Sequence, residues 1–556
     1  MANFVAVPAC YPKLVDLRKS KTASFKNNKF LKESTVLRYY QTIGALHMMM
    51  LERMVLGDST GTGKTIQTIA AYSFLFEKDS TLKILIIVPK SALYQWGEEF
   101  DKFTTGITYR IILNEYEGLM GYKARKLQYE RFKENVMIIG YAPLRMEYEA
   151  VKEAMGNNYM VVFDEATAFK SRKTETYFAC KNIAESAKRA YGLSATIIKN
   201  DLEEVYSIYD VIVPGLFGRI TKFKDTYCVQ KMLRLMIGGK IRHIPKIVGY
   251  KNLTQFKQVI DPYFLIRRKE EIATELPTLI SRKIILEMGP EQKELYRLAL
   301  QGVLYEERVK REFYEVMDQV RLGATDEKTL KRYNDLKEKY EKFATVEGKK
   351  RGKLAAVTYC QMVSNGPALV NQPGESSKAE EFERLMKEEL VNEKVILFTR
   401  FKSGIPYLEI ICERNHIKYV KITGDQNDTE RQHARLTFQN DPKCNLIFIT
   451  TAGSASLNLQ AAGTLIFYDT PWSYGDLVQT IGRAQRIGSI QEHVLIIHLV
   501  NKGTIDLRVI NKVTDKKQLS DQILGDTAQG ALNFVAHDET VVDDLYQDLL
   551  KDAEAL

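Results

Sequence analysis

The chain has 556 residues, 45% of them hydrophobic, and is therefore long enough to bury two separate cores. Its net charge of +10 is compatible with a polyanionic partner, but it is also compatible with a charge that serves only solubility. Charge alone therefore does not distinguish these two possibilities. Six cysteines without a C-x-x-C pair argue against a zinc site and a disulfide framework, and favour a reducing compartment.

Residues 1–34 form a basic N-terminal arm with few apolar residues. Its cations are Lys13, Arg18, Lys19, Lys21, Lys26, Lys29 and Lys32. Such a run is typical of a solvated face or a loose arm. The more specific alternative is that its cations contact phosphates. No charged-then-apolar signal pattern is present, and no apolar run approaches the roughly 18 residues that cross a bilayer. We therefore expect a soluble intracellular protein with no membrane partner.

A glycine-rich segment follows the apolar run that ends at Leu56. It is Gly57-Asp-Ser-Thr-Gly-Thr-Gly-Lys64-Thr65, and a helical pattern begins directly after it. In such a loop, backbone N–H groups face phosphate oxygens, the lysine reaches the β/γ-phosphates and the threonine hydroxyl ligates Mg²⁺. An ordinary glycine-rich surface turn is the alternative. The predicted nucleotide contacts are Asp58, Ser59, Thr60, Gly61, Thr62, Gly63, Lys64 and Thr65.

Two carboxylates end a strand pattern further along the chain. Met160-Val-Val-Phe163 is apolar, as a buried parallel strand is, and Asp164 and Glu165 follow it. Beside a phosphate loop, we expect Asp164 to hold Mg²⁺ and Glu165 to orient and deprotonate the attacking water. Solvated turn residues are the alternative. Together the two motifs predict hydrolysis of a nucleoside triphosphate.

The first part of the chain alternates strand and helix patterns. Apolar runs recur at 84–88, 136–139, 160–163 and 190–193 and predict a parallel sheet with helices on both faces. Ligands bind beyond the carboxyl ends of such strands. The polar clusters that the sequence places there are Pro89-Lys90-Ser91, Tyr141, Asp164-Glu165 and Ser194-Ala-Thr196.

The pattern becomes charge-rich and helical over about 201–374. Segments 291–311 and 328–350 carry Glu and Lys at exposed-helix spacing, so we expect helical protrusions rather than a sheet. Strand patterns then return and predict a second α/β domain; they lie at 394–398, 418–422, 446–450, 464–468 and 494–500. Residues 526–556 are acidic and predict a flexible or weakly helical tail.

Two arginines stand three residues apart in the segment Gln479-Thr-Ile-Gly-Arg483-Ala-Gln-Arg486-Ile-Gly488. On a helix, this spacing places both guanidinium groups on one face. Phosphoryl transfer gains from cations that reach the γ-phosphate only in a closed state. We therefore expect Arg483 and Arg486 to be arginine fingers; two merely exposed arginines are the alternative. The predicted catalytic residues are thus Lys64, Asp164, Glu165, Arg483 and Arg486.

In its ordered set of blocks, the chain resembles the Swi/Snf family of DNA-translocating ATPases within helicase superfamily two, over about 35–525. The first-lobe blocks are Leu37-Arg-Tyr-Tyr-Gln41, Gly57 to Thr65, Leu85-Ile-Ile-Val-Pro-Lys-Ser-Ala-Leu-Tyr-Gln-Trp96, Gly140-Tyr-Ala-Pro-Leu144, Asp164-Glu-Ala-Thr167 and Leu193-Ser-Ala-Thr196. The linker signature is Phe264-Leu-Ile-Arg-Arg-Lys269 with Leu276-Pro277. The second-lobe blocks are Lys394 to Phe401, Thr423-Gly-Asp425, Thr450 to Leu459, Asp469-Thr-Pro-Trp472 and Gln479 to Gly488.

The resemblance implies an α/β fold of two RecA-like parallel-sheet lobes with helical Snf-type protrusions between them. The implied parts are the arm (1–34), a first ATP-binding lobe (35–275, with a helical insertion at about 201–260), a helical protrusion and linker (276–375), a second lobe (376–525) and the acidic tail (526–556). The implied cofactors are ATP and Mg²⁺, with Gln41 reading adenine. The implied DNA contacts are Pro89, Lys90, Ser91, Tyr141, Thr399, Arg400, Thr423, Thr450 and Thr451.

Three residues depart from the pattern of the family. Thr167 stands where histidine is usual, and Ser454 and Ser456 stand where glycines are common. These departures put the coupling between the ATP and DNA sites in doubt, but no residue needed for hydrolysis is missing. Because the implied DNA contacts suit phosphates, we expect little base readout and a strong dependence on salt.

The resemblance predicts a DNA-dependent ATPase that translocates as a monomer on double-stranded DNA, forked or branched, without separating strands. It would serve branch migration, fork remodelling or protein displacement in replication, recombination or repair. Two alternatives stay open: a strand-separating DNA or RNA helicase, and a DNA-binding remodeller subunit that is active only with a partner. No recognisable chromatin module flanks the core, so we expect a prokaryotic or viral factor of the cytoplasm rather than the nucleus.

Overall fold

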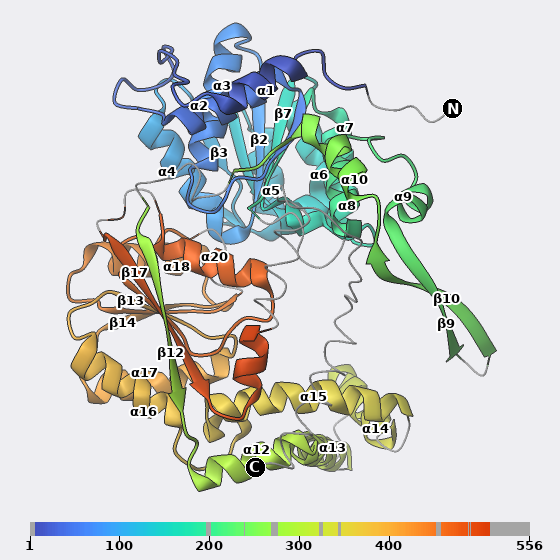
Figure 1. Cartoon of the computed structure of the whole chain (residues 1–556), viewed down its shortest axis with the longest axis vertical. Helices are drawn as coiled ribbons and strands as arrows, with labels where there is room; N and C mark the ends of the chain where they lie inside the picture. The colour runs from blue at the N-terminus through green and yellow to red at the C-terminus, as the bar shows by residue number, and fades with distance from the viewer. Residues whose placement is uncertain are drawn as a thin grey trace.

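The computed structural model describes residues 6–195, 202–237, 240–267, 276–321, 326–342, 346–451, 457–486, 489 and 491–511. Figure 1 shows two α/β lobes, one above the other, with a group of helices beside the second lobe. Each lobe is built on a parallel sheet, so the predicted fold class is confirmed. The predicted acidic tail, 526–556, lies outside the described residues.

The first lobe is built on a seven-stranded sheet with the order β11-β1-β8-β7-β2-β6-β3, and all its pairings are parallel. The central strands are almost entirely apolar because helices bury both of their faces. The strands are β1 (Arg53–Leu56), β2 (Lys83–Val88), β3 (Tyr109–Ile111), β6 (Val136–Gly140), β7 (Tyr159–Asp164), β8 (Arg189–Leu193) and β11 (Phe264–Leu265).

Helices cover both faces of this sheet (Figure 1). One core contains Met48, Ile69 and Trp96 from the helices of one face, and the other contains Val151 and Ile183 from the opposite face. The helices are α1 (Tyr11–Lys19), α2 (Tyr39–Met50), α3 (Lys64–Lys78), α4 (Leu93–Phe103), α5 (Gly121–Glu130), α6 (Tyr141–Met155), α7 (Glu175–Ser186), α8 (Leu202–Ile212), α9 (Ile220–Tyr227) and α10 (Leu253–Ile260), and a small hairpin joins β4 (Glu115–Tyr116) to β5 (Leu119–Met120).

The second lobe has a six-stranded parallel sheet with the order β12-β17-β16-β13-β15-β14. One core packs Phe382 and Leu408 against the sheet, and a second packs Phe438 and Ala484 against its other face. The elements are β12 (Thr278–Leu286), α16 (Ser377–Arg384), β13 (Val395–Phe398), α17 (Ile405–Arg414), β14 (Tyr419–Ile422), α18 (Asp428–Asn440), β15 (Leu446–Ile449), β16 (Thr464–Phe467), α20 (Tyr474–Ala484) and β17 (His493–Asn501).

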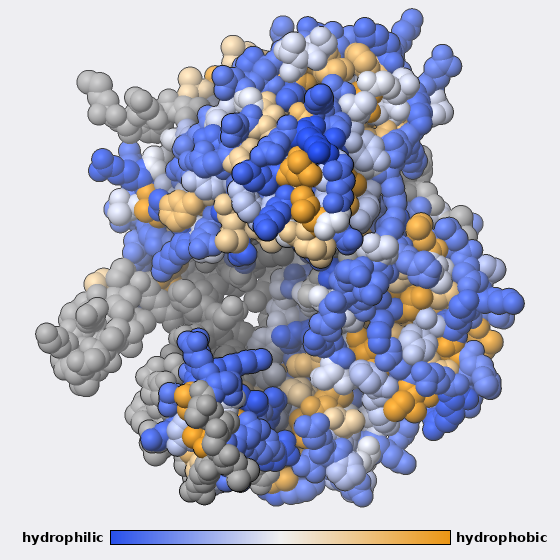
Figure 2. Space-filling model, turned by 180° about the vertical axis from the view of Figure 1, so that it is seen from behind, coloured by the Kyte–Doolittle hydropathy of each residue, from blue (hydrophilic) through white to orange (hydrophobic). Residues whose placement is uncertain are grey.

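Long helices lie between the lobes in the sequence, as the charge pattern predicts. α13 and α14 form their own small core of Phe313, Val316 and Leu336, whereas α12 and α15 pack with Ile505 and Val509 of the second lobe. The helices are α12 (Pro290–Leu300), α13 (Val303–Arg321), α14 (Glu327–Lys342) and α15 (Val346–Asn365). Figure 2 shows hydrophilic side chains over most of the face opposite to Figure 1, with apolar residues scattered among them.

Two parts of the predicted helical region are strands. β9 (Cys228–Ile237) and β10 (Lys240–Tyr250) form an antiparallel ribbon inside the insertion that was expected to be helical. The sequence signal is a Gly-Gly pair between two runs rich in apolar residues, which favours a hairpin. β12 likewise pairs along β17 as the edge strand of the second sheet, because Thr278–Leu286 is rich in β-branched residues.

The basic N-terminal arm is not loose over residues 6–34. Leu14 and Leu31 are buried in the first lobe. Arg18 donates hydrogen bonds to the Asp261 carboxylate at 2.9 and 3.0 Å, and to the backbone oxygen of Phe264 at 3.0 Å. The arm therefore packs against the lobe through two buried leucines and one ion pair. The high positive charge of the arm gives no sign of these contacts in the sequence. Within the described residues, no helix is long and apolar enough to cross a membrane.

Candidate active site

The glycine-rich loop joins the end of β1 to the N-terminus of α3. Gly61 and Gly63 have φ angles of +80° and +84°, a left-handed conformation that favours glycine. A Cβ on Gly63 would lie 2.5 Å from Gln41 Nε2, so close packing demands glycine as well. A left-handed loop that enters a helix N-terminus is an anion-binding arrangement.

The ammonium group of Lys64 lies over this loop. Its Nζ donates to the backbone oxygens of Asp58, at 2.7 Å, and Ser59, at 3.2 Å. Burial lowers the pKa of Lys64, while the nearby carboxylates of Glu165 and Asp164 act in the opposite direction. The cation is therefore held between the loop and the acidic pair.

The acidic pair lies at the carboxyl end of β7, where Asp164 is the last strand residue and Glu165 follows it. Asp164 Oδ2 accepts a hydrogen bond from Trp96 Nε1 at 2.9 Å, and Oδ1 accepts one from the Glu165 backbone N at 3.1 Å. Burial, and then the charge of Glu165, raise the pKa of Asp164 to about 6. Glu165 has a φ of +54°, which costs a non-glycine residue on the order of 1–3 kcal/mol. Strain of this kind is typical of a functional carboxylate.

Helix α20 of the second lobe brings its side chains onto this pair and the loop. Gln479 Nε2 donates to Glu165 Oε2 at 3.0 Å. Gly482 lies so close to the loop that a Cβ would be 2.2 Å from Thr60 Oγ1. Arg483, 3% exposed, sits at the same junction, and burial lowers its pKa while Glu165 and Asp164 oppose that shift. The two lobes thus form one composite site.

The prediction that Arg483 and Arg486 share one face of a helix is wrong, because only Arg483 belongs to α20. α20 ends at Ala484, so Arg486 lies beyond the helix. It nevertheless returns to the loop, because its Nε donates to the Gly482 oxygen at 2.9 Å and its Cγ would lie 3.3 Å from a Cβ on Gly61. Burial, and then the charge of Arg483, lower the pKa of Arg486 to about 9. Two cations buried this close together favour a bound anion.

The junction fits a triphosphate with Mg²⁺. Within the described ranges, two buried polar atoms there lack hydrogen-bond partners: Thr60 Oγ1 and Arg483 Nε. Buried polar atoms are normally satisfied, and phosphate oxygens would accept hydrogen bonds from both. The Thr65 hydroxyl and the Asp164 carboxylate are the hard oxygen ligands that Mg²⁺ prefers.

The sequence predicts a nucleotide contact at Asp58, but the structure directs its carboxylate to Arg267. Asp58 is fully buried, and Arg267 Nε and Nη2 donate to its two oxygens at 2.9 and 2.5 Å. Arg267 also donates to the backbone oxygen of Tyr40 at 2.5 Å and to Gln67 Oε1 at 3.1 Å. Only the backbone oxygen of Asp58 faces Lys64. The ion pair therefore ties the phosphate loop to α2, to α3 and to the end of β11.

Gln41 contacts the phosphate loop directly. Its Nε2 donates to the Thr62 oxygen at 3.1 Å, and its Oε1 accepts from the Arg38 backbone N at 3.0 Å. The second contact caps the N-terminus of α2. Gln41 is thus fixed beside the loop, where an adenine contact stays a prediction.

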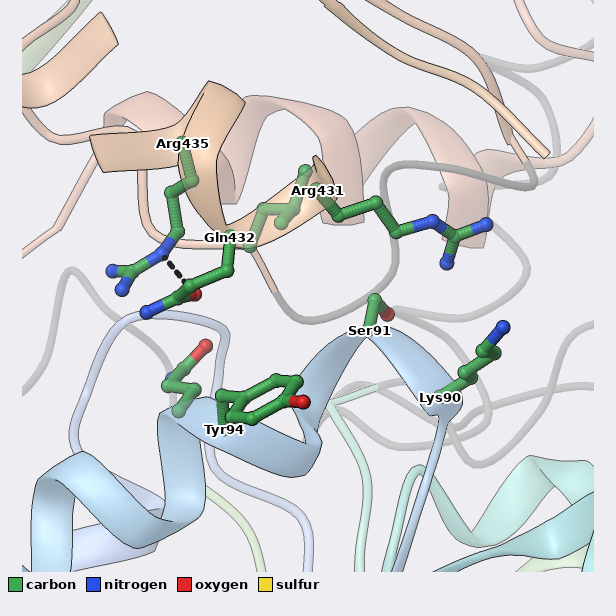
Figure 3. A pocket seen from close by; sticks show the side chains of 8 residues that line it. Lys90, Ser91, Tyr94, Arg431, Gln432 and Arg435 are labelled. Carbon is green, nitrogen blue, oxygen red and sulfur yellow. Dashed lines mark hydrogen bonds between the residues drawn. The ribbon is translucent and has the colours of Figure 1, made fainter. Parts of the chain in front are cut away.

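Two of the predicted DNA residues lie at a pocket between the lobes. Lys90 and Ser91 face Arg431 and Arg435 of α18 across it (Figure 3). The pocket is bounded by an ion pair between the lobes, because Arg435 Nη2 lies 2.7 Å from Glu98 Oε1. Arg431 is held in place by its Nη2, which donates to the Thr423 oxygen at 3.1 Å. Cationic side chains from both lobes therefore line the pocket.

The other predicted DNA residues lie in different environments. Thr399 is buried and donates to Asp469 Oδ2 at 2.6 Å. Arg400 donates to Gln361 Oε1 at 2.6 Å. The Tyr141 hydroxyl donates to the backbone oxygen of Asp164 at 2.7 Å, so it lies beside the acidic pair. The remaining positions are Thr423, buried and bonded to Gln426, Thr450, buried, Thr451, exposed, and Pro89, half-buried.

Three residues that contact the site's carboxylates were assigned no function from the sequence: Trp96, Arg267 and Gln479. All three lie within the recognised blocks, which is the only signal that the sequence offers for them. Their partners are 68, 209 and 314 residues away in the chain. Local patterns cannot reveal contacts across such separations. Thr196, Lys269, Ser454, Ser456 and Gly488, which the blocks also include, lie outside the described residues.

Residues 40–343 match the SNF2-related domain, and residues 377–488 match the helicase conserved C-terminal domain. The chain is 26% identical over 500 residues to an uncharacterized ATP-dependent helicase of Mycoplasma pneumoniae, covering 89% of this chain and 42% of that protein. It is 25% identical over 491 residues to the DNA repair and recombination protein RAD54B of Mus musculus, covering 84% and 53%. The chain spans about half the length of these curated relatives.

The chain also aligns with a solved structure, the Sulfolobus solfataricus SWI2/SNF2 ATPase core in complex with dsDNA. The two are 22% identical, and the alignment covers 95% of this chain and 99% of that one. The TM-score is 0.39.

Trp96→Phe tests the hydrogen bond to Asp164. The variant keeps a buried aromatic ring and removes the N–H donor. It also makes the buried side chain smaller, and the control below shares this loss of volume. A hydrogen bond to a charged group contributes about 1.5–3 kcal/mol, so we expect the Mg²⁺ concentration for half-maximal ATP hydrolysis to rise about tenfold or more. The measurement is a Mg²⁺ titration of hydrolysis and of fluorescent nucleotide binding.

Trp472→Phe is the matched control, because Trp472 is the second of the two tryptophans and donates to Gln361 at 2.9 Å in the second lobe. We expect its Mg²⁺ dependence to equal that of the wild type. Equal shifts in both variants would show that the effect is a general one of tryptophan replacement.

Arg267→Met tests the buried ion pair. The variant leaves the Asp58 carboxylate buried without its cation, which costs on the order of 3–5 kcal/mol of stability. We expect the first thermal unfolding transition to move to a clearly lower temperature, measured by calorimetry. Adding Asp58→Asn removes the orphaned charge and should recover part of the loss. A single variant as stable as the wild type would show that the pair is dispensable.

Proposed function

Because the chain belongs to the SNF2-related family of helicase superfamily two, we propose that it hydrolyses ATP in order to translocate on double-stranded DNA. The observation that carries this proposal is the composite site. Lys64 and Glu165 of the first lobe lie beside Arg483 of the second lobe at one phosphate-binding loop. A site divided between two lobes can convert hydrolysis into motion of one lobe against the other.

In the proposed reaction, the loop 57–65 holds the phosphates of ATP. Lys64 exchanges its contacts with the loop carbonyls for the β/γ-phosphates. Thr65 and Asp164 would hold Mg²⁺, which would supply charge neutralisation. Glu165 then accepts the proton of the attacking water. The contact with Gln479 keeps the Glu165 carboxylate in position while the lobes are together.

The two arginines couple this chemistry to lobe closure. Arg483 and Arg486 are buried near each other at the loop, so the γ-phosphate supplies the anion that this pair favours. Loss of that phosphate after hydrolysis removes the attraction between the lobes. Repeated closing and opening would move one lobe along a DNA strand, as in gated enzymes generally.

The pocket between the lobes supports DNA as the polymer along which the protein translocates. Lys90 and Arg431 supply positive charge there, and contacts of such cations with phosphates do not read bases. Similarity to a DNA repair and recombination protein supports DNA as the substrate. We propose that this DNA is forked or branched and that a monomer binds it. The Mycoplasma relative supports a cytoplasmic site of action.

The decisive experiment compares ATP hydrolysis on linear duplex, single-stranded DNA, forked or four-way DNA, and RNA. We expect duplex DNA to stimulate hydrolysis and branched DNA to do so most strongly. Lys64→Ala and Glu165→Gln should abolish hydrolysis on every substrate. Displacement of a third strand bound to a duplex provides the readout of translocation.

The other outcomes separate the alternatives. Stimulation by single strands or RNA alone would favour a strand-separating helicase. Absence of hydrolysis by the isolated chain on any nucleic acid would favour a subunit that depends on a partner. Hydrolysis without displacement of the third strand would reject translocation.

Arg483→Lys tests the arginine finger. Lysine keeps the charge but not the planar fork that binds phosphate oxygens. We expect kcat to fall about 100-fold or more while the affinity for nucleotide changes little, because the contact acts in the transition state. The control is Arg414→Lys, an exposed arginine of the same lobe. An unchanged kcat in Arg483→Lys would reject its catalytic role.

A further inference from the structure

A two-stranded ribbon projects from the first lobe. β9 and β10 pair with each other along their length, from Cys228 opposite Tyr250 to Ile237 opposite Lys240. They form a sheet of their own among the described strands. Figure 1 shows the ribbon on the side of the lobe that carries α8, α9 and α10, extending beyond the body of the lobe.

The base of the ribbon is firmly attached. Cys228 and Tyr250 are 2% and 3% exposed and belong to the first-lobe core. Next to them, the Lys251 backbone N donates to the Tyr227 oxygen at 2.9 Å. A strand of ten residues extends on the order of 30 Å, so this anchored base supports an arm about as long as one turn of a DNA duplex.

The ribbon carries charge of one sign only. Every charged residue from Cys228 to Lys251 is cationic, and aspartate and glutamate are absent from this stretch of the sequence. The cations are Lys231, Arg234, Lys240, Arg242, Lys246 and Lys251. Lys231 is exposed, and the apolar side chains of Val229 and Met232 beside it are 41% and 57% exposed.

These features do not serve the fold of the lobe. An isolated two-stranded ribbon is marginally stable in water, and like charges within it repel one another. Lysines on exposed strand edges do protect against aggregation, but mixed charges would do so at lower electrostatic cost. A polyanion would relieve the repulsion. Because the major groove of duplex DNA admits a two-stranded ribbon, duplex DNA matches both the charge and the shape of the arm.

We propose that the β9–β10 ribbon is a second DNA-binding element, which grips the duplex outside the pocket between the lobes. This proposal rests on the proposed function, since it assigns the same substrate to a separate surface. Figure 1 places α4 and α18, which border the pocket, on the opposite side of the molecule from the ribbon. A duplex held at both places would be retained by the ribbon while the lobes open and release their own contacts.

Two variants of the full chain test the proposal. In the first, Asn-Gly replaces residues 230–248, because Val229 and Gly249 are paired and a two-residue Asn-Gly turn closes such a pair. The second keeps the strands and removes charge through Lys231→Gln, Arg234→Gln, Arg242→Gln and Lys246→Gln. A control variant removes four exposed lysines elsewhere on the first lobe, through Lys78→Gln, Lys123→Gln, Lys133→Gln and Lys188→Gln.

The measurements are duplex affinity by fluorescence anisotropy at several salt concentrations, and ATP hydrolysis at saturating duplex. We expect both ribbon variants to bind duplex about tenfold or more weakly near 0.1 M salt. In the charge variant, the slope of log K against log salt should become shallower by about 3–4, because each lost phosphate contact removes about 0.9. The kcat at saturating duplex should stay within about twofold of the wild type.

The outcomes separate this proposal from the proposed function. Ribbon variants with the affinity and salt slope of the control variant would overturn the ribbon proposal while leaving DNA-stimulated hydrolysis intact. Binding of polyglutamate to each variant is measured in the same anisotropy assay. If the ribbon variants lose polyglutamate binding but keep their duplex affinity, the ribbon belongs to an acidic protein partner, which also overturns the proposal. A wild-type chain whose hydrolysis ignores all DNA would instead reject the proposed function.

Discussion

The buried ion pair between Asp58 and Arg267 fixes the part of the molecule on which the site depends. Asp58 belongs to the phosphate loop, and Arg267 follows β11, the last strand of the first lobe. A buried pair of charges is stable only when hydrogen bonds satisfy both ions, and here the Tyr40 oxygen and Gln67 take the remaining donors of the guanidinium group. One interaction thus holds the loop, two helices and the point where the chain leaves the lobe.

The active site is assembled across the two lobes around this fixed loop. The first lobe supplies the cation of Lys64 and the strained Glu165, and the second lobe supplies Gln479 and the two buried arginines. The close approach of Gly482 to Thr60 leaves no room for a side chain. Because buried like charges repel and buried polar atoms need partners, the assembled site favours an anion at its centre. Charge repulsion and hydrogen-bonding needs therefore both favour an anionic ligand.

The sequence predicted the two sheets well because their strands are buried on both faces and are continuously apolar, as in β2, β7 and β15. It failed where that signal weakens. The β9–β10 ribbon is exposed and rich in cations, so its charge resembled that of the helical protrusions nearby, although the Gly-Gly pair favours a hairpin. The edge strand β12 was hidden for the same reason, because most of its residues are exposed.

The sequence by itself determined the elements whose chemistry is local: the glycine-rich loop, the carboxylates at the end of β7 and the parallel strands that place them at one edge. Only the tertiary structure decided which partner each side chain meets. It pairs the Asp58 carboxylate with Arg267, places Trp96 in hydrogen-bond contact with Asp164, and brings Arg486 to the loop although that residue lies beyond the end of α20. The physical reason is that hydrogen bonds and ion pairs act over a few ångströms in space, whereas the residues that form them lie up to hundreds of positions apart in the chain.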